Sequence, residues 1–237
     1  MPDRYYKKEL YPFQDEVLGV IGEAGSDFYL TGGTALSRAY LQHRYSDDLD
    51  FFVNDSSAFK KQTQTIITAL QRHFGDSPQI GLAETSYVRL FLRRSSVLLK
   101  IEFVNDVPFH LGELKKTGLF NRIDNWQNIL ANKISALGRD EGKDFADILS
   151  LAKWFPFQWQ EMIAAAKKKD MWVNELAISE LFFNFAAGRM ADLHWIRPFA
   201  AKPAEKSLKI IAADILHGRQ NSLYKKKKQH KPSVRQK

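Results

Sequence analysis

The sequence predicts an α+β protein in which a small mixed β-sheet is followed by a C-terminal helical bundle. Short apolar runs bounded by turn residues, which are typical of strands, occur only before about residue 115. From about residue 121 onward, apolar residues recur at helical spacing. The chain of 237 residues is long enough to bury one large core or two smaller ones.

The first half alternates helices with strands. Residues 28–30 form an apolar run that stops at Gly32 and Gly33, which predicts a strand leading into a glycine turn. The run over 93–96 separates two apolar stretches and predicts a hairpin turn. The expected elements are helices at 1–27, 34–43 and 57–74, and strands at 28–30, 49–53, 87–92 and 97–104.

The second half is expected to be helical throughout, with prolines between the helices. Further helices are expected at 158–167, 174–188 and 203–217. We therefore expect an α+β domain over 1–115, a helical domain over 116–222 and a basic tail over 223–237. A block of like charges is typical of disorder, so the tail is expected to be disordered.

Composition excludes several classes of protein. Hydrophobic residues make up 44% and charged residues 26%, as in ordinary globular proteins. No run approaches the roughly 18 apolar residues that a membrane span needs, and the first residues lack the apolar stretch of a secretory signal. The absence of cysteine excludes disulfides and thiolate metal sites. We therefore expect a cytoplasmic protein without a membrane partner.

The positive charge is concentrated at the end of the sequence. The formal net charge is +8, and the stretch from Lys225 to Lys237 carries seven basic residues and no acid. The rest of the chain is therefore close to neutral. A basic segment favours a polyanionic partner such as RNA, because neutralised phosphates release their counterions. The alternative is a tail that only keeps the protein in solution.

Two aspartates provide a candidate metal site. Asp48 and Asp50 are separated by one residue on an expected strand, so both carboxylates point to the same face, about 6–7 Å apart at Cα. Carboxylates this close repel each other, and a divalent cation removes that repulsion. Mg²⁺ prefers carboxylate oxygens together with substrate phosphates. Asp48 and Asp50 are therefore the first candidates for catalytic metal ligands.

The glycine turn is a candidate phosphate site. A strand that ends in Gly32-Gly33 and opens a helix can bring backbone N–H groups close to an anion. Thr34 can donate its hydroxyl or cap the helix. A triphosphate held at this turn and bridged by Mg²⁺ to Asp48 and Asp50 is suited to in-line attack at the α-phosphate.

A third carboxylate is expected in two-metal phosphoryl transfer, and Glu102 is the candidate. Glu102 and Lys100 share one face of an otherwise apolar strand. If this strand lies beside that of Asp50, Glu102 can join the metal site and help to deprotonate the attacking hydroxyl. The alternative is a cross-strand ion pair between Glu102 and Arg89.

Several motifs in this order resemble a known family. The pattern is Gly-Gly-Thr, a helix, and then Arg44-x-Ser46-x-Asp48-Leu-Asp50, followed by a second block from Lys133 to Asp147. It resembles the AbiEii/AbiGii nucleotidyltransferase-like toxins of the DNA-polymerase-β-like nucleotidyltransferase superfamily. The resemblance runs from about residue 28 to 152. Thirteen residues separate Thr34 from Asp48, slightly more than in superfamily members with a Gly-Ser turn.

The resemblance implies a nucleotidyltransferase fold and a toxin of a toxin–antitoxin or abortive-infection system, with an antitoxin as partner. It implies transfer of a nucleotide from an NTP, in some members to tRNA, with Mg²⁺, two ions being expected. By the same resemblance, Asp48 and Asp50 bind metal. Gly33 and Thr34 bind phosphate and Lys133 contacts the nucleotide. Asp144 or Asp147 completes the site from the helical half, in the motif that also contains Lys143.

Other interpretations stay open at this point. The acceptor can be a hydroxyl of a protein or a small molecule instead of RNA. The chain can also be an inactive nucleotidyltransferase-fold protein that acts by binding, although Asp48, Asp50 and Glu102 are all present. Lys143 and Asp147 lie four residues apart and can form an exposed ion pair on a helix.

Overall fold

The computed structural model describes residues 2–75 and 78–225. The chain divides into two compact units. The first runs to Ile129 and includes His194–Arg197, and the second comprises Leu130–Leu193 and the residues from Pro198 onward. The predicted domain boundary, with an α+β domain over 1–115 and a helical domain over 116–222, stays a prediction. The expected disorder of the basic tail concerns residues 226–237, which lie outside the described residues.

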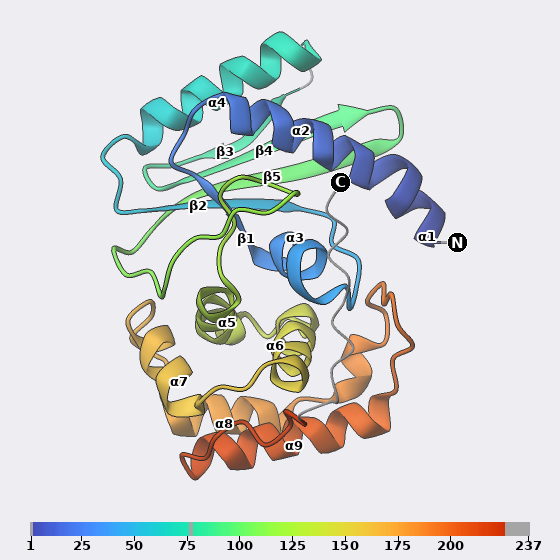
Figure 1. The fold of residues 1–237 in the computed structure, drawn as a ribbon, viewed down its shortest axis with the longest axis vertical. Helices are drawn as coiled ribbons and strands as arrows, with labels where there is room; N and C mark the ends of the chain where they lie inside the picture. Colours follow the sequence, from blue (N-terminus) through green and yellow to red (C-terminus); the bar gives the residue numbers. More distant parts are fainter. Residues whose placement is uncertain (1, 76–77, 226–237) are drawn as a thin grey trace. The chain divides into compact units, whose positions relative to one another are not determined.

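The first unit is built on a five-stranded sheet in the order β1-β2-β5-β4-β3 (Figure 1). β2 and β5 run parallel, whereas the other neighbouring pairs are antiparallel, so the sheet is mixed as the sequence predicts. The strands are β1 (Tyr29–Thr31), β2 (Leu49–Asn54), β3 (Gln79–Ala83), β4 (Tyr87–Arg94) and β5 (Val97–Asp106).

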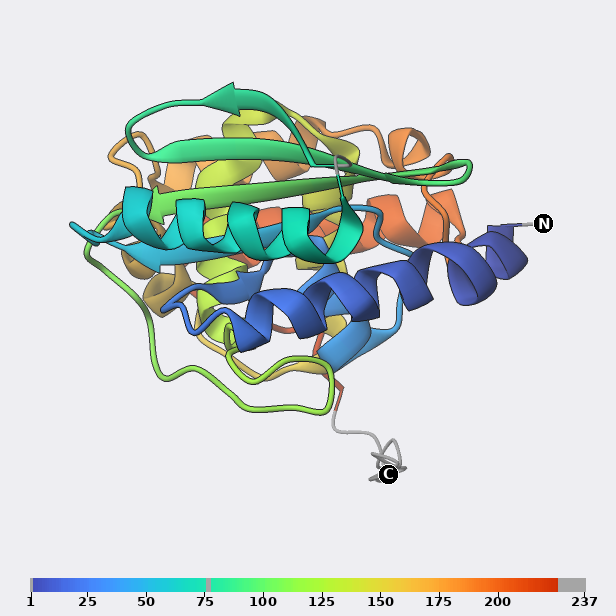
Figure 2. The ribbon, with the colours of Figure 1, turned by 90° about the horizontal axis from the view of Figure 1, so that it is seen from above.

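Helices cover one face of this sheet (Figure 2). Alternate residues of β2 are buried, among them Leu49 and Phe51, and Phe51 stacks on Phe103 of β5. Because strand side chains alternate, the intervening residues of β2 and β5 point to the opposite face. The helices of this unit are α1 (Pro2–Tyr5), η1 (Tyr6–Leu10) and α2 (Tyr11–Glu23), then α3 (Gly32–Ala35), η2 (Leu36–Leu41) and α4 (Phe59–Phe74).

One local prediction is confirmed, and one strand was missed. The hairpin between β4 and β5 is confirmed, and Ser95 at its turn has a φ of 51°. Strand β3 was not predicted. All of its residues are exposed, so its sequence lacks the buried alternation by which a strand is recognised.

The second unit is helical, as the sequence predicts. Its core contains Phe145, Trp159 and Phe182. Two of its helices, α8 (Glu175–Asn184) and α9 (Ala201–Leu216), pack side by side. Pro156 lies between two of the helices. No helix within the described ranges is long and apolar enough to cross a membrane. The elements are α5 (Trp126–Ser135), which begins in the first unit, η3 (Ala136–Arg139), α6 (Gly142–Trp154), α7 (Trp159–Lys167), α8 (Glu175–Asn184), η4 (Ala187–Met190) and α9 (Ala201–Leu216).

Candidate active site

The two aspartates lie at the start of the central strand β2. Asp48 directly precedes the strand, and Asp50 is its second residue. In the sheet register, Asp50 lies opposite Thr31 of β1 on one side and opposite Glu102 of β5 on the other. Leu49 is buried, whereas Asp48 and Asp50 are only partly covered. The strand therefore directs both carboxylates away from the helix-covered face, and it places Glu102 beside Asp50.

The glycine turn packs directly against this strand. Gly32 has a φ of +68°, and a Cβ built on it would lie 2.1 Å from Oδ2 of Asp50. A Cβ on Gly33 would lie 2.7 Å from Nη2 of Arg44 and 2.8 Å from Oγ of Ser46. Only glycine can occupy these positions without moving its neighbours. The structure therefore brings the Gly-Gly turn, Arg44, Ser46 and Asp50 into one cluster.

Hydroxyl groups after the turn hold the aspartate segment in place. Thr34 is fully buried, and its Oγ1 donates to the backbone carbonyl of Asp48. Ser37 donates to the backbone carbonyl of Arg44. The Thr34 hydroxyl is thus engaged with the protein. A phosphate at this turn would meet the backbone of the turn, and the phosphate role predicted for Gly32, Gly33 and Thr34 stays a prediction.

Lys100 places a positive charge between the carboxylates of Asp48 and Glu102. Its Nζ lies 2.9 Å from Oδ2 of Asp48 and 3.2 Å from Oε2 of Glu102. Burial opposes the charged form of this ammonium, but the two carboxylates outweigh burial and raise the pKa of Lys100. Lys100 therefore stays protonated and neutralises part of the negative charge of the cluster.

Glu102 is held by three neighbours. Arg89 Nε lies 2.8 Å from Oε1, so the expected alternative partner is indeed present. Tyr87 also donates to Oε1, and Lys100 approaches Oε2. Burial alone would raise the pKa of Glu102, but the hydrogen bond from Tyr87 and the charges of Lys100 and Arg89 lower it to about 2. A carboxylate with so low a pKa is a weak base, which favours a role of Glu102 as a negative charge, and its predicted part in deprotonating the acceptor stays a prediction.

The donor set suits a divalent cation that replaces the Lys100 ammonium. Within residues 2–75 and 78–225, no three His, Asp or Glu side chains are gathered as a ready metal cluster. Asp48 and Glu102 nevertheless share one cation, the ammonium of Lys100, and carboxylate oxygens are the ligands that Mg²⁺ prefers. The metal role of Asp48, Asp50 and Glu102 stays a prediction.

The second block of motif residues gathers inside the helical unit. Lys133 Nζ lies 2.6 Å from Oδ1 of Asp144 and 3.0 Å from Oδ2 of Asp147, and both aspartates are fully buried. Arg139 Nη2 lies 3.0 Å from Oδ2 of Asp144. Asp147 is therefore not half of an exposed ion pair, because its helix turns it inward. Lys143 instead lies 2.7 Å from Glu141 on the surface.

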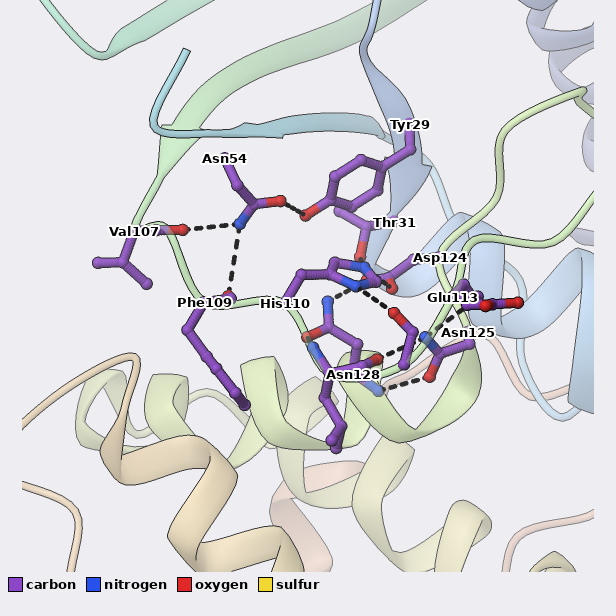
Figure 3. A network of polar contacts seen from close by, with 12 residues as sticks. Tyr29, Thr31, Asn54, Val107, Phe109, His110, Glu113, Asp124, Asn125 and Asn128 are labelled. Carbon is purple, nitrogen blue, oxygen red and sulfur yellow. Dashed lines mark hydrogen bonds and ion pairs between the residues drawn. The ribbon is translucent and has the colours of Figure 1, made fainter.

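A buried polar network that the sequence did not reveal adjoins the glycine turn (Figure 3). Its centre is Asp124, which is fully buried and accepts hydrogen bonds from Thr31 Oγ1 and Asn128 Nδ2. His110 Nε2 lies 3.0 Å from the other carboxylate oxygen. Thr31 lies 93 residues from Asp124 in the sequence, so neither spacing nor periodicity could indicate this contact.

A second contact fixes the aspartate segment from the N-terminal helix. Tyr6 stacks on Tyr45, with 4.1 Å between the ring centroids, and its hydroxyl donates to Oδ1 of Asp47. His194 Nδ1 also contacts the Tyr6 hydroxyl. The only hydroxyl proton goes to Asp47, so His194 acts as the donor. Burial, and then the hydrogen bond to Asp47, raise the pKa of Tyr6.

Known structures share this fold. JHP933 from Helicobacter pylori is 18% identical with a TM-score of 0.58, and the match covers 89% of this chain and 93% of that one. MenT4, a nucleotidyltransferase toxin from Mycobacterium tuberculosis H37Rv, is 16% identical with a TM-score of 0.59 and coverages of 87% and 82%. At this identity the likeness shows the fold alone, which is the nucleotidyltransferase fold that the resemblance implied.

The family follows from the sequence match. No curated protein has a significantly similar sequence. The profile of the family described as "Nucleotidyl transferase AbiEii toxin, Type IV TA system" matches residues 19–226, which is most of the chain. The match includes the glycine turn, both aspartates and the buried cluster of Lys133. The chain therefore belongs to the AbiEii family of nucleotidyl transferase toxins.

Proposed function

We propose that this toxin transfers a nucleotide from an NTP to a hydroxyl of RNA, with tRNA as the first candidate, in a reaction that depends on Mg²⁺. The observation that supports the chemistry is the close packing of the glycine turn on Asp50, with Glu102 beside Asp50 in the neighbouring strand. A phosphate-binding turn in contact with a carboxylate pair is the arrangement that a metal-bound triphosphate needs.

The residues of the chain then have distinct roles. The backbone of Gly32 and Gly33 binds the phosphates, while Asp48 and Asp50 hold Mg²⁺, with Glu102 as a third negative charge. Bound Mg²⁺ would neutralise the phosphates and stabilise the charge that develops at the attacking and leaving oxygens. Lys100, which lies between Asp48 and Glu102, would compete with the cation for these carboxylates. The acceptor hydroxyl attacks the α-phosphorus, its proton passes to water, and the bond from the α-phosphorus to the bridging oxygen breaks so that pyrophosphate leaves.

The ionic cluster of Lys133 is the second part of the proposal. Lys133, Asp144 and Asp147 form a buried ionic cluster, and a buried cluster of this kind holds its members in fixed positions. We assign Lys133 and the Lys143–Asp147 segment to the nucleotide on the strength of the family resemblance.

RNA is favoured as the acceptor by the charge of the chain. The stretch from Lys225 to Lys237 carries seven basic residues without an acid, and most of it lies outside the described residues. Such a segment would bind the phosphate backbone without regard to sequence. We place the reaction in the cytoplasm, with an antitoxin as the partner that opposes it.

The test is an incubation of the purified protein with Mg²⁺, each α-³²P-labelled NTP and total tRNA. The proposal expects label on tRNA for the wild type and none for Asp48→Asn. Asp55→Asn is the control, because Asp55 lies at the exposed far end of the same strand and has a positive φ that Asn tolerates. Label on protein instead of tRNA would identify a protein hydroxyl as the acceptor and overturn the RNA proposal.

A further inference from the structure

We propose that Asp124 is a positioning residue that fixes the Thr31-Gly32-Gly33 turn in the geometry that binds the triphosphate. The inference rests on the proposed function of the turn as a phosphate site. It adds to that function a residue outside both motif blocks and far from the glycine turn in sequence, which contacts neither phosphate nor metal. Asp124 acts through Thr31, the residue directly before the glycines.

Asp124 is a buried carboxylate with a full set of donors. One oxygen, Oδ2, accepts from Thr31 Oγ1 at 2.7 Å and from Asn128 Nδ2 at 2.9 Å. The other, Oδ1, lies 3.0 Å from His110 Nε2, while His110 Nδ1 lies 2.8 Å from the carbonyl oxygen of Gly112. Both ring nitrogens of His110 therefore face oxygen atoms of the network, and the ring bridges Asp124 to the loop at Gly112.

The backbone of Asp124 holds the elements on both sides of the turn. Its N–H donates to the carbonyl of Leu30 in β1, at 2.9 Å. Its carbonyl accepts from the hydroxyl of Tyr40 in η2, the helix that follows the turn, at 2.8 Å. Figure 3 shows the side-chain contact of Asp124 with Thr31. One residue thus ties the strand before the glycines to the helix after them.

The hydroxyl of Thr31 bonds to Asp124 and does not cap the helix that follows. It occupies the N-cap position of the helix that begins at Gly32, where a threonine hydroxyl commonly caps the first backbone N–H groups. Here Thr31 makes no side-chain capping hydrogen bond, and its hydroxyl donates to Asp124. Asp124 therefore directs this hydroxyl away from the start of the helix, which is the part of the turn assigned to phosphate.

The turn has little freedom to move without a functional effect. Gly32 already touches the Asp50 carboxylate, and Thr31 pairs with Asp50 in the sheet. A displacement of Thr31 by a few tenths of an ångström would therefore change the distance between the turn and Asp50. Small misplacements of binding groups are known to have large effects on reactivity. A buried network at Thr31 is thus an effective place to set this geometry.

The test compares two hydroxyl deletions on the same strand face. Thr31→Val removes the donor to Asp124, and Tyr29→Phe removes a hydroxyl of the same strand that donates to Asn54 at 3.0 Å. Calorimetry measures the dissociation constants of the Mg²⁺ complexes of the four α,β-methylene NTP analogues. We expect Thr31→Val and Asp124→Asn each to weaken the tightest complex about tenfold, since the first removes the buried hydrogen bond and the second removes the charge of its acceptor. Thr31→Ser should restore binding.

Two further comparisons separate positioning from general loss of structure. The double variant Thr31→Val/Asp124→Asn should bind the nucleotide complex no more weakly than the weaker-binding of the two single variants, because both changes act through one hydrogen bond. Tyr29→Phe should bind within about twofold of the wild type, even where its Tm falls as far as that of Thr31→Val. Wild-type affinity in Thr31→Val, or an equal loss in Tyr29→Phe, would overturn the inference alone. A wild type that binds none of the four complexes would overturn the proposed function and the inference with it.

Discussion

Gly32 lies against the carboxylate of Asp50 so closely that a Cβ on Gly32 would stand 2.1 Å from Oδ2. Gly32→Ala must therefore displace Asp50 as well as strain the backbone at a φ of +68°. Gly25 has the same φ, but a Cβ there would meet nothing within 4 Å. We expect Gly25→Ala to lose only the strain energy, about 1 kcal/mol in the free energy of unfolding.

Gly32→Ala should lose more stability than Gly25→Ala in urea unfolding, and nucleotide transfer should fall about a hundredfold because the turn and Asp50 separate. Gly25→Ala should retain transfer. Equal losses of transfer in the two variants would show that the close approach of Gly32 to Asp50 has no functional role.

Lys100 competes with a divalent cation for the same carboxylates. Its Nζ lies 2.9 Å from Asp48 and 3.2 Å from Glu102. Lys100→Met should lower the Tm of the metal-free protein, because two carboxylates lose their shared cation. The same change should tighten Mn²⁺ binding, measured by electron paramagnetic resonance, by about tenfold through the loss of a competing charge.

Lys209→Met is the control for this comparison, since Lys209 forms an exposed pair with Glu205 at 3.3 Å. It should leave Mn²⁺ affinity unchanged. Unchanged or weaker Mn²⁺ binding in Lys100→Met would contradict a competing role of Lys100.

The helical unit depends on the buried charges around Lys133. Lys133→Met leaves Asp144 and Asp147 buried without their shared ammonium, and breaking a buried ion pair in this way costs about 3–5 kcal/mol. Lys143→Met removes only the surface contact with Glu141 and should cost less than about 1 kcal/mol. Urea unfolding followed by circular dichroism measures both. A small loss in Lys133→Met would show that the cluster does not stabilise this unit.

Alkaline pH should destabilise the protein through Tyr6. Burial and the bond to Asp47 raise its pKa above the ordinary value of 10. The folded state therefore keeps a proton that the unfolded state releases, and stability falls as the pH rises above about 10. In Tyr6→Phe the urea midpoint should fall less steeply between pH 9 and 11. A slope equal to that of the wild type would mean that Tyr6 does not contribute. Part of the slope should remain in Tyr6→Phe, because burial also raises the pKa of Tyr29.

The central part of the site could be predicted because it depends on short-range rules. Strand alternation places Asp48 and Asp50 on one face, and a Gly-Gly pair marks a turn whatever lies around it. The placement of Glu102 beside Asp50 needed one further assumption, that their strands are neighbours, and the register confirms it. The nucleotidyltransferase fold followed from motif order rather than from any single element.

The rest depends on long-range packing, which periodicity does not report. The burial of Asp144 and Asp147 could not be predicted, because acidic residues on a helix usually face water. Asp124 meets Thr31 and His110 only after the chain has folded. Strand β3 is recognised only by its pairing with β4, since its own residues are all exposed.

The most direct measurement is transfer of ³²P from the four α-labelled NTPs to total tRNA by three proteins: wild type, Asp50→Asn and Asp55→Asn. Asp50 touches the glycine turn, whereas Asp55 lies beyond the end of the same strand. We expect the wild type and Asp55→Asn to label tRNA at similar rates in Mg²⁺, and Asp50→Asn to leave it unlabelled. Labelling by Asp50→Asn at the wild-type rate would contradict the assignment of this carboxylate cluster as the active site.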